Sequence, residues 1–233
     1  NECTKKRGSL IEILRHGIEI SCVKLDLMYT KPTTTFNKDL LDKYTKNRFS
    51  VMEEVYANDK ECIDIVIFLN GFAIISIELK CNFAGQSVND AIYQYHKDRD
   101  PKSRLFLFKA GTLVNFTMNL HEVYMAIKLD GLKTFFLPFN QDNGIGVNAG
   151  AGNSSCEDNY SVHYMWDDIL TKDTILDLIS KFIFVETKEK ENEKTGKIEV
   201  TESLIFPRYH QLDAIRKILK YVKENLTSLN YLI

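Results

Sequence analysis

The sequence predicts an α/β fold with a central mixed β-sheet flanked by helices. Two β-branched and aromatic-rich runs, at 62–69 and 72–80, surround Asn70-Gly71, which is a strong signal for a β-hairpin. Both runs are almost continuously apolar, so we expect both faces of the hairpin to be covered, as in the middle of an α/β sheet. A helical pattern at 88–98 and further strand patterns come next in the chain.

The other elements are predicted by the same periodicities and by their end signals. Gly17 ends the first helix, and Asn37 is the expected N-cap of the second. Besides 88–98, we expect helices at 10–17, 37–47, 173–185 and from about 210. Besides the hairpin, we expect strands at 23–29, 49–56, 105–108, 113–118, 122–129 and 134–137. A glycine- and asparagine-rich loop at 140–153 lacks the residue order of a phosphate-binding P-loop.

These elements predict one large domain over 10–185, a charged linker over 186–203 and a separate segment over 204–233. The 233 residues are 44% hydrophobic and 27% charged, which excludes a disordered tail, a collagen-like repeat and a small disulfide scaffold. The formal charge of −2 creates no strong field that would attract nucleic acid or an acidic membrane. Any contact with DNA would therefore need a local patch or partner proteins.

The five cysteines are widely spread and form no C-x-x-C motif, which predicts reduced thiols in a cytoplasmic protein. The apolar runs at 65–69 and 72–77 are too short to span a bilayer, so we expect no membrane partner. We recognise no signal peptide. Because the chain starts at Asn1 rather than at a methionine, we expect a fragment or a processed product.

Charged residues inside the apolar hairpin indicate chemistry. A buried carboxylate is usually paired or bound to a metal, because its unpaired burial is costly. Asp64 begins one run, and Glu78-Leu79-Lys80 ends the other. The two carboxylates and the Leu79 carbonyl could hold a hard cation such as Mg²⁺, while Lys80 could orient a water molecule. A structural ion pair at a strand end explains the same residues, so both interpretations stay open.

The spacing E-x-K is weak by itself, because about one such match is expected by chance in a chain of this length. A second copy occurs at Glu186-Thr187-Lys188, where it enters the charged linker and is interpreted as a solvated face. The copy at Glu78 differs because it follows two strands and the upstream Asp64, and because a helix comes after it.

Strand register gives a sharper test of this site. A two-residue Asn70-Gly71 turn would place Asp64 opposite Ile77, so Glu78 and Lys80 would point to the other face of the sheet. A three-residue loop, or a bulge between 65 and 77, would bring Asp64, Glu78 and Lys80 to one face. The metal-site hypothesis therefore requires one of these two irregularities.

The next helix supplies two further candidates, Gln94 and Tyr95. Gln94 could bond the site or DNA, although an exposed helical glutamine is the simpler interpretation. The stretch 97–109 has five basic residues against two acidic ones. It could contact phosphates, but an ordinary solvated loop explains it equally well. The five basic residues are Lys97, Arg99, Lys102, Arg104 and Lys109.

Asp64, Glu78-Leu79-Lys80 and Gln94 together resemble the PD-(D/E)xK nuclease module. Over about 10–225, the chain resembles the N-terminal part of the restriction (motor) subunit of type I restriction–modification enzymes. This resemblance is more specific than an E-x-K match, because it depends on an ordered set of segments. The segments are 63–71, 77–80, 94–100, 134–140 and 205–211.

The resemblance implies a PD-(D/E)xK nuclease core that hydrolyses DNA phosphodiesters with Mg²⁺. It assigns Asp64 and Glu78, with the Leu79 carbonyl, to the metal and Lys80 to catalysis. Gln94 matches the glutamine of a Gln-x-x-x-Tyr element, but the fourth residue after it is Asp98. Tyr95 is therefore the alternative tyrosine, with a role in DNA binding or in support of the site.

The resemblance also implies that 10–185 is the endonuclease domain and that 204–233 starts a helicase (motor) domain. Gln211 matches a glutamine that recognises adenine in the full-length family members. No Walker A or Walker B motif follows in this sequence, so we do not expect this part to hydrolyse ATP. The implied partners are double-stranded DNA and the methylation and specificity subunits, with non-specific cleavage after ATP-driven translocation.

Two other functions fit the same residues. In the first, Asp64, Glu78 and Lys80 form a structural ion cluster, and the domain docks the motor to the methylase without catalysis. In the second, the chain is a repair or junction-resolving nuclease with the same core, acting without a translocating motor.

Overall fold

A computed structural model describes residues 8–142, 152–191, 196 and 198–225. Its centre is a six-stranded sheet with the order β3-β4-β5-β6-β7-β8. The β5–β6 pair is parallel and the other pairs are antiparallel, so the predicted mixed sheet is confirmed. The strands are β3 (Phe49–Asn58), β4 (Glu61–Leu69), β5 (Phe72–Leu79), β6 (Val114–Met118), β7 (Val123–Ala126) and β8 (Leu137–Pro138).

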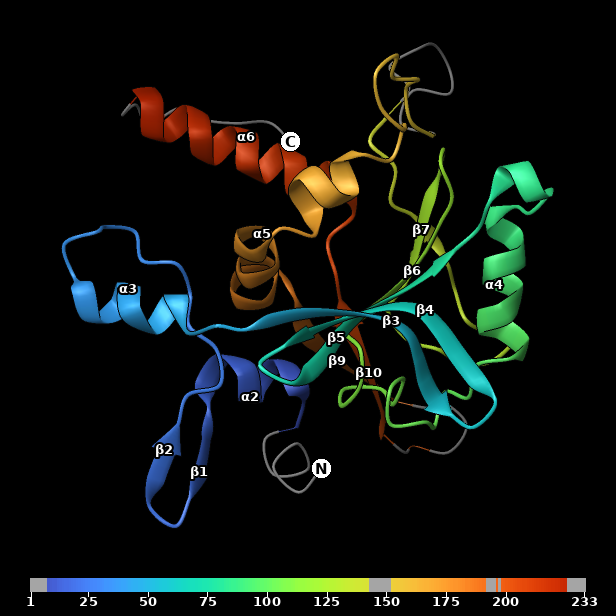
Figure 1. The fold of residues 1–233 in the computed structure, drawn as a ribbon. Coiled ribbons are helices and arrows are strands. Elements are labelled where there is room, and N and C mark those ends of the chain that lie inside the picture. The colour runs from blue at the N-terminus through green and yellow to red at the C-terminus, as the bar shows by residue number, and fades with distance from the viewer. Residues whose placement is uncertain (1–7, 143–151, 192–195, 197, 226–233) are drawn as a thin grey trace.

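Helices cover both faces of this sheet (Figure 1). One face carries α4 (Val88–Lys97), which contacts β5 and β6. The other face packs against α2 (Leu10–His16), α5 (Lys172–Asp177) and the π-helical turn η4 (Leu178–Phe182). The remaining elements are β1 (Ile18–Ile20), β2 (Val23–Leu25), α3 (Lys38–Thr45), η1 (Asn82–Ala84), η3 (Met165–Ile169), β9 (Phe184–Glu191), β10 (Ile198–Ile205) and α6 (Tyr209–Asn225).

Two apolar clusters form the core, one on each face of the sheet. The larger cluster joins the sheet to α2, α5, η4 and the segment before α6, and includes Ile11, Leu14, Phe116, Ile175, Ile179 and Phe206. The smaller cluster lies under α4 and consists of Ile63, Val66, Tyr95, Phe106, Ala126 and Leu129. Burial on both sides explains why the hairpin runs lack the alternation of a half-exposed strand.

Of the two turn lengths left open by the sequence, the hairpin has the two-residue one, and β5 contains a bulge. Asn70 and Gly71 have φ angles of 50° and 86°, and Leu69 pairs with Phe72 across them. The register then shifts between the Phe68–Ala73 and Ile67–Ile75 pairs, so Ile74 is the extra residue. The bulge is one of the two irregularities that the site hypothesis required.

Several sequence predictions are wrong in detail. The predicted strand at 105–108 consists of turns, and 134–137 contributes only the start of the two-residue strand β8. The predicted helix at 173–185 ends at Phe182, because the chain enters β9 directly afterwards. Arg15 donates hydrogen bonds to the carbonyls of Ile179 and Ile183 at this end. Most of the predicted loop at 140–153 lies outside the described residues.

The charged segment at 186–203 is not an irregular linker, because β9 and β10 form an antiparallel hairpin there. The charged side chains of β9 do not oppose strand formation, since most of them lie in solvent. The segment after it packs on the domain, with Leu204, Phe206 and Leu212 buried in the larger cluster.

The described helices include none that is both long enough and apolar enough to cross a bilayer.

The turn residue Asn70 connects the hairpin to the N-terminal segment. Its Oδ1 accepts from the Arg48 N–H at 2.7 Å, and its Nδ2 donates to the Leu27 carbonyl at 2.7 Å. We expect Asn70→Gly to keep the left-handed turn but to lower the free energy of unfolding by about 1–3 kcal/mol, because these groups lose their partner. Urea unfolding measures this change, and an unchanged midpoint would contradict it.

Candidate functional site

Asp64 on β4 and Glu78 on β5 lie level with each other at the end of the bulged hairpin. They follow the Ile65–Ile77 pair in the antiparallel register. Opposed residues point to the same face, which here is the face that carries α4. The Leu79 N–H donates to Asp64 Oδ2 at 2.7 Å and holds this carboxylate against the end of β5. The bulge therefore brings together the two acids that the sequence pattern selected.

The carboxylate of Glu78 is buried and is paired with Arg99. Glu78 is 1% exposed and Arg99 is 8% exposed. Nε and Nη2 of Arg99 both donate to Oε1 of Glu78, at 2.8 and 2.5 Å. Nη2 also donates to the Cys62 carbonyl at 2.9 Å. Arg99 thus links the end of α4 to both strands that carry the acids.

The electrostatics of this cluster are unbalanced. Burial is the largest cause that raises the pKa of Glu78, from 4.5 to about 7. The Arg99 guanidinium opposes this rise, whereas the charge and hydrogen bonding of Asp64 add to it. Among the described ion pairs, Arg99 pairs with Glu78 and none includes Asp64, so one paired cation lies beside two neighbouring carboxylates.

The donor atoms fit a hard divalent cation. Arg99 bonds Oε1 of Glu78, and the Leu79 N–H bonds Oδ2 of Asp64. The two carboxylates also lie within hydrogen-bonding reach of each other, so their oxygens converge on one place. A cation bound by these oxygens would supply the missing positive charge. No group of three or more His, Cys, Asp or Glu side chains suited to a metal occurs in the described part of the chain. A magnesium ion here would complete its shell with water, backbone or substrate oxygens, as it commonly does.

Lys80 follows β5 directly and is half-buried. Its N–H donates to the Met118 carbonyl at 2.9 Å. Asp90 lies in the first turn of α4, and its pKa is lowered mainly by hydrogen bonds from Ser87. The charge of Lys80 lowers the pKa of Asp90 further. Among the described ion pairs within 4.0 Å, none includes Lys80, so its predicted action on a water molecule near the acids stays a prediction.

Gln94 and Tyr95 differ in their surroundings. Tyr95 is fully buried in the smaller cluster, and its hydroxyl lies 2.8 Å from Ser76 Oγ. It therefore has no surface for direct DNA contact, and only the predicted supporting role remains. Gln94 is half-buried, and its Oε1 is buried without a hydrogen-bond partner among the described residues.

The roles of Leu79 as a metal ligand and of Gln211 in adenine recognition stay predictions. The side chain of Leu79 is 41% exposed, and its carbonyl remains a predicted metal ligand. Gln211 lies in the first turn of α6, where its Oε1 accepts from the Arg208 N–H at 2.9 Å. This bond closes the helix start, and the adenine role of Gln211 stays a prediction.

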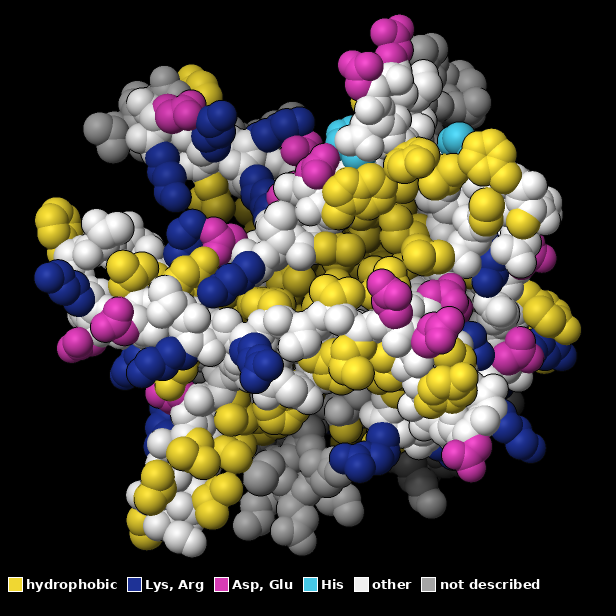
Figure 2. All heavy atoms as spheres, viewed as in Figure 1, with side chains coloured by type: hydrophobic (Ala, Val, Ile, Leu, Met, Phe, Trp, Pro, Cys, Tyr) yellow, Lys and Arg dark blue, Asp and Glu magenta, His cyan; other side chains and the backbone are white. Residues whose placement is uncertain are grey.

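The basic side chains of 97–109 do not form one continuous basic surface. Arg99 is turned inward to Glu78, and Lys109 pairs with Glu202 at 2.8 Å. In the view of Figure 2, Lys and Arg side chains gather over α6 and α3, whereas acidic side chains lie over β3 and β4. Glu53 and Glu54 are exposed on β3, and Glu54 lies level with Asp64 in the β3–β4 register. The strands that carry the acids therefore offer no strongly basic surface in this view.

Arg99 is a site residue that the sequence does not single out, because it lies in a basic stretch that phosphate contacts or a solvated loop would explain equally well. Its position directly after α4 gives no local signal of burial. The available clue was Glu78, since a carboxylate inside an apolar strand requires a cationic partner. The identity of that partner depends on how α4 crosses the sheet.

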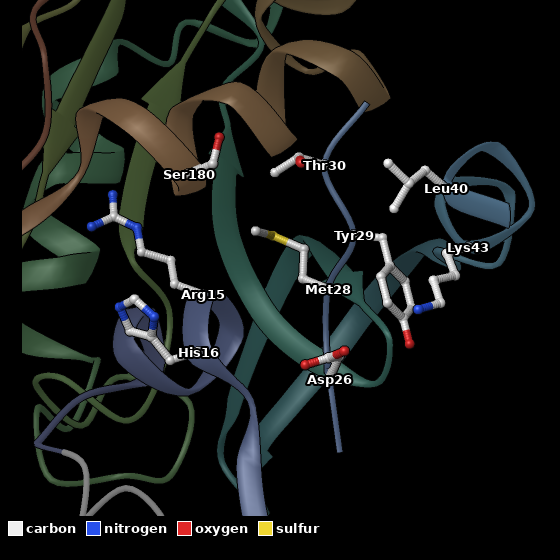
Figure 3. A pocket seen from close by; sticks show the side chains of 9 residues that line it. All are labelled: Arg15, His16, Asp26, Met28, Tyr29, Thr30, Leu40, Lys43 and Ser180. Atoms are coloured by element: carbon white, nitrogen blue, oxygen red, sulfur yellow. The ribbon is translucent and has the colours of Figure 1, made fainter. Parts of the chain in front are cut away.

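A cavity of about 360 Å³ lies on the opposite face of the sheet. Figure 3 shows Arg15 and His16 of α2 on one wall and Leu40 and Lys43 of α3 on the other. Two cationic side chains that line this cavity already have partners. Arg15 donates to backbone carbonyls, and the Lys43 ammonium lies over the ring of Tyr29. This cavity is separate from the acids at the hairpin end.

Comparison with known proteins adds two findings. Residues 9–137 match the family model described as the type I restriction enzyme R protein N terminus. The chain is also similar to a protein of Methanocaldococcus jannaschii named "Putative type I restriction enzyme MjaVIIIP endonuclease subunit", with 26% identity over 240 residues. That match covers 97% of this chain but 20% of the relative, so the chain spans about one fifth of the length of that relative.

The Glu78–Arg99 pair predicts a strong and pH-dependent effect of Arg99→Met. We expect a loss of about 3–5 kcal/mol in the free energy of unfolding at pH 8, because a buried carboxylate loses its partner. A carboxyl whose pKa is raised by folding stabilises the fold in its protonated form. This contribution is complete below about 4.5 and is lost as the pH rises through about 7. The loss caused by Arg99→Met should therefore be smaller at pH 5.

Urea unfolding at the two pH values measures this effect. The double variant Glu78→Leu/Arg99→Met is the control, since removal of both charges should restore most of the stability. Equal losses at pH 5 and pH 8 would contradict the assignment of a raised Glu78 pKa.

Proposed function

This chain belongs to the family of type I restriction enzyme R protein N-terminal regions, and on that premise we propose that it is a Mg²⁺-dependent DNA endonuclease domain with a PD-(D/E)xK core. The observation that carries the proposal is the bulge at Ile74, which places Asp64 and Glu78 side by side. Without that extra residue, the two acids would lie on opposite faces of the sheet. A purely structural hairpin has no need of this register.

Each residue of the cluster has a chemical task in the proposed reaction. Asp64 and Glu78 hold the cation, with the Leu79 carbonyl as a further ligand. When bound, the cation polarises the phosphodiester and makes a water molecule more acidic. Lys80 orients that water and offsets developing negative charge. Arg99 keeps the Glu78 carboxylate in place, and Gln94 supports the substrate or the ligands around the acids.

The proposed substrate is double-stranded DNA, cut at non-specific positions in the cytoplasm after ATP-driven translocation. Helicase domains outside this chain would supply the ATP-dependent motor, and Gln211 would recognise adenine in the longer protein. Methylation and specificity subunits are the proposed partners. The formal charge of −2 and the acidic side chains over β3 and β4 support this division of work, because the domain by itself has little attraction for DNA.

A non-catalytic docking domain is the second candidate, and the Glu78–Arg99 pair favours it. This pair satisfies one oxygen of the buried acid without any metal, as a structural ion cluster would. Its difficulty is Asp64, because the charge of this second carboxylate adds to the effect of burial in raising the pKa of Glu78.

Substitution of the proposed site separates the two candidates. In the full-length subunit assembled with its partners, we expect Asp64→Asn and Lys80→Ala to reduce DNA cleavage at least 100-fold while ATP hydrolysis continues. Lys188→Ala is the matched control, since Lys188 ends the second E-x-K copy and pairs with exposed Glu186 at 2.9 Å. Full cleavage by the Asp64 and Lys80 variants would support the docking function.

The affinity for Mg²⁺ should depend on pH. Glu78 must be ionised to bind a cation. Burial raises the pKa of Glu78 to about 7, and the charged or titratable groups that act on it are Arg99, Asp64 and Tyr95. We therefore expect the affinity to rise about fivefold from pH 6 to pH 7 and about tenfold from pH 6 to pH 8, with proton release, and to level off above pH 8. Titration calorimetry of the 233-residue chain measures this dependence. Asp64→Asn is the control, and equal affinity at pH 6 and pH 8 would contradict Glu78 as a ligand.

A further inference from the structure

Thr117 on β6 has a buried hydroxyl with no hydrogen-bond partner among the described residues. The residue is 0% exposed. Burying a hydroxyl without a partner costs free energy, and valine would fill nearly the same volume without that cost. A threonine here therefore needs a reason beyond packing.

The register of the sheet places Thr117 directly beside Glu78. The two residues are partners in the parallel β5–β6 pair, so their side chains point to the same face. On β6, Phe116 and Met118 belong to the larger cluster, which assigns Thr117 to the opposite face, under α4. Thr117 is thus the next residue across the sheet after Asp64 and Glu78.

The neighbouring polar residues on this face, unlike Thr117, have hydrogen-bond partners. Asn115 Oδ1 accepts hydrogen bonds from Ser76 at 2.7 Å and from Thr112 at 2.8 Å. Its Nδ2 donates to the Ala126 carbonyl at 3.2 Å. Both polar atoms of the side chain two residues before Thr117 therefore have a partner, whereas the Thr117 hydroxyl, at the level of the acids, has none among the described residues.

Helix α4 brings a second unpaired oxygen to the same face. Gln94 Oε1 is buried without a partner in the described part of the chain, and α4 contacts both β5 and β6. Gln94 lies one helical turn after Asp90 on α4. The charge of Lys80 acts on Asp90 and lowers its pKa, after the larger effect of the hydrogen bonds from Ser87. A third such oxygen, Ser103 Oγ, lies in the turns that follow α4.

The chemistry of these groups indicates what they bind. Thr117 Oγ1 and Gln94 Oε1 can both accept a hydrogen bond, whereas Arg99 can only donate. Water molecules around Mg²⁺ have protons to donate and need acceptors near the ion. Carboxylate oxygens that bind the cation are already used. Hydroxyl and amide oxygens beside the carboxylates suit these waters.

We propose that Thr117 is a positioning residue whose hydroxyl holds a water of the hydrated cation beside Asp64 and Glu78. The inference rests on the proposed Mg²⁺ site and adds a residue from a third strand to it. Thr117 contributes through the water that it orients.

Thr117→Val tests this role, because it removes the hydroxyl and keeps the shape. We expect thermal stability that is equal or higher, together with a Mg²⁺ affinity about tenfold lower by titration calorimetry. Thr117→Ser should keep the affinity, since it keeps the hydroxyl. Thr112→Val is the matched control on the same face. It should lose stability, because the Thr112 hydroxyl is bonded to Asn115, and it should bind Mg²⁺ as the unchanged protein does.

The outcomes separate this inference from the proposed function. If the unchanged chain and Asp64→Asn bind Mg²⁺ equally, or neither binds it, the proposed metal site fails. If Asp64→Asn abolishes binding while Thr117→Val binds normally, the role of Thr117 is overturned and the metal site stands. Loss of affinity in both Thr117→Val and Thr117→Ser would also overturn it, because the hydroxyl would not be the cause.

Discussion

Burial of the Glu78 carboxylate is the constraint that organises this part of the molecule. A charge in the interior must be balanced, and Arg99 balances it by reaching back from the end of α4 to β4 and β5. That contact fixes how the helix crosses the sheet. Burial is the largest cause that raises the pKa of Glu78 to about 7, Arg99 opposes this rise, and the nearby Asp64 carboxylate adds to it. A cluster that is stable as an ion pair and still short of positive charge is well suited to bind a cation.

The two faces of the sheet have different physical roles. The larger cluster is almost entirely apolar and joins the sheet to α2, α5, η4 and the segment before α6. The face under α4 instead carries a polar network around Ser76 and Asn115, with the acids at one end. Polar groups on a buried face cost stability unless each is paired. The smaller apolar cluster around Tyr95 lies on the same face and supports α4 above the network.

The C-terminal helix is attached to the structural face rather than to the acids. Arg216 of α6 binds Asp168 at 2.9 Å and donates to Thr174 at 2.7 Å. Tyr209 packs against Phe139 and Tyr164, and Phe206 packs against Phe116. Phe116 lies on β6 next to Thr117, so one strand contacts the C-terminal segment on one face and borders the acids on the other. These contacts hold the first half of α6, whereas Leu219 in its second half is exposed.

The sequence was enough to predict the hairpin around Asn70-Gly71 and the helix after it, because these depend on local patterns of apolar, glycine and charged residues. It also pointed to Asp64 and Glu78 as candidates, since charges inside apolar strands stand out in a local pattern. It did not determine the β9–β10 hairpin, since backbone pairing there follows from a partner strand and not from apolar residues. Only the tertiary structure decided that a bulge aligns the acids and that Arg99 and Thr117 border them. Register, burial and helix crossing depend on contacts between distant residues, and a local pattern does not encode them.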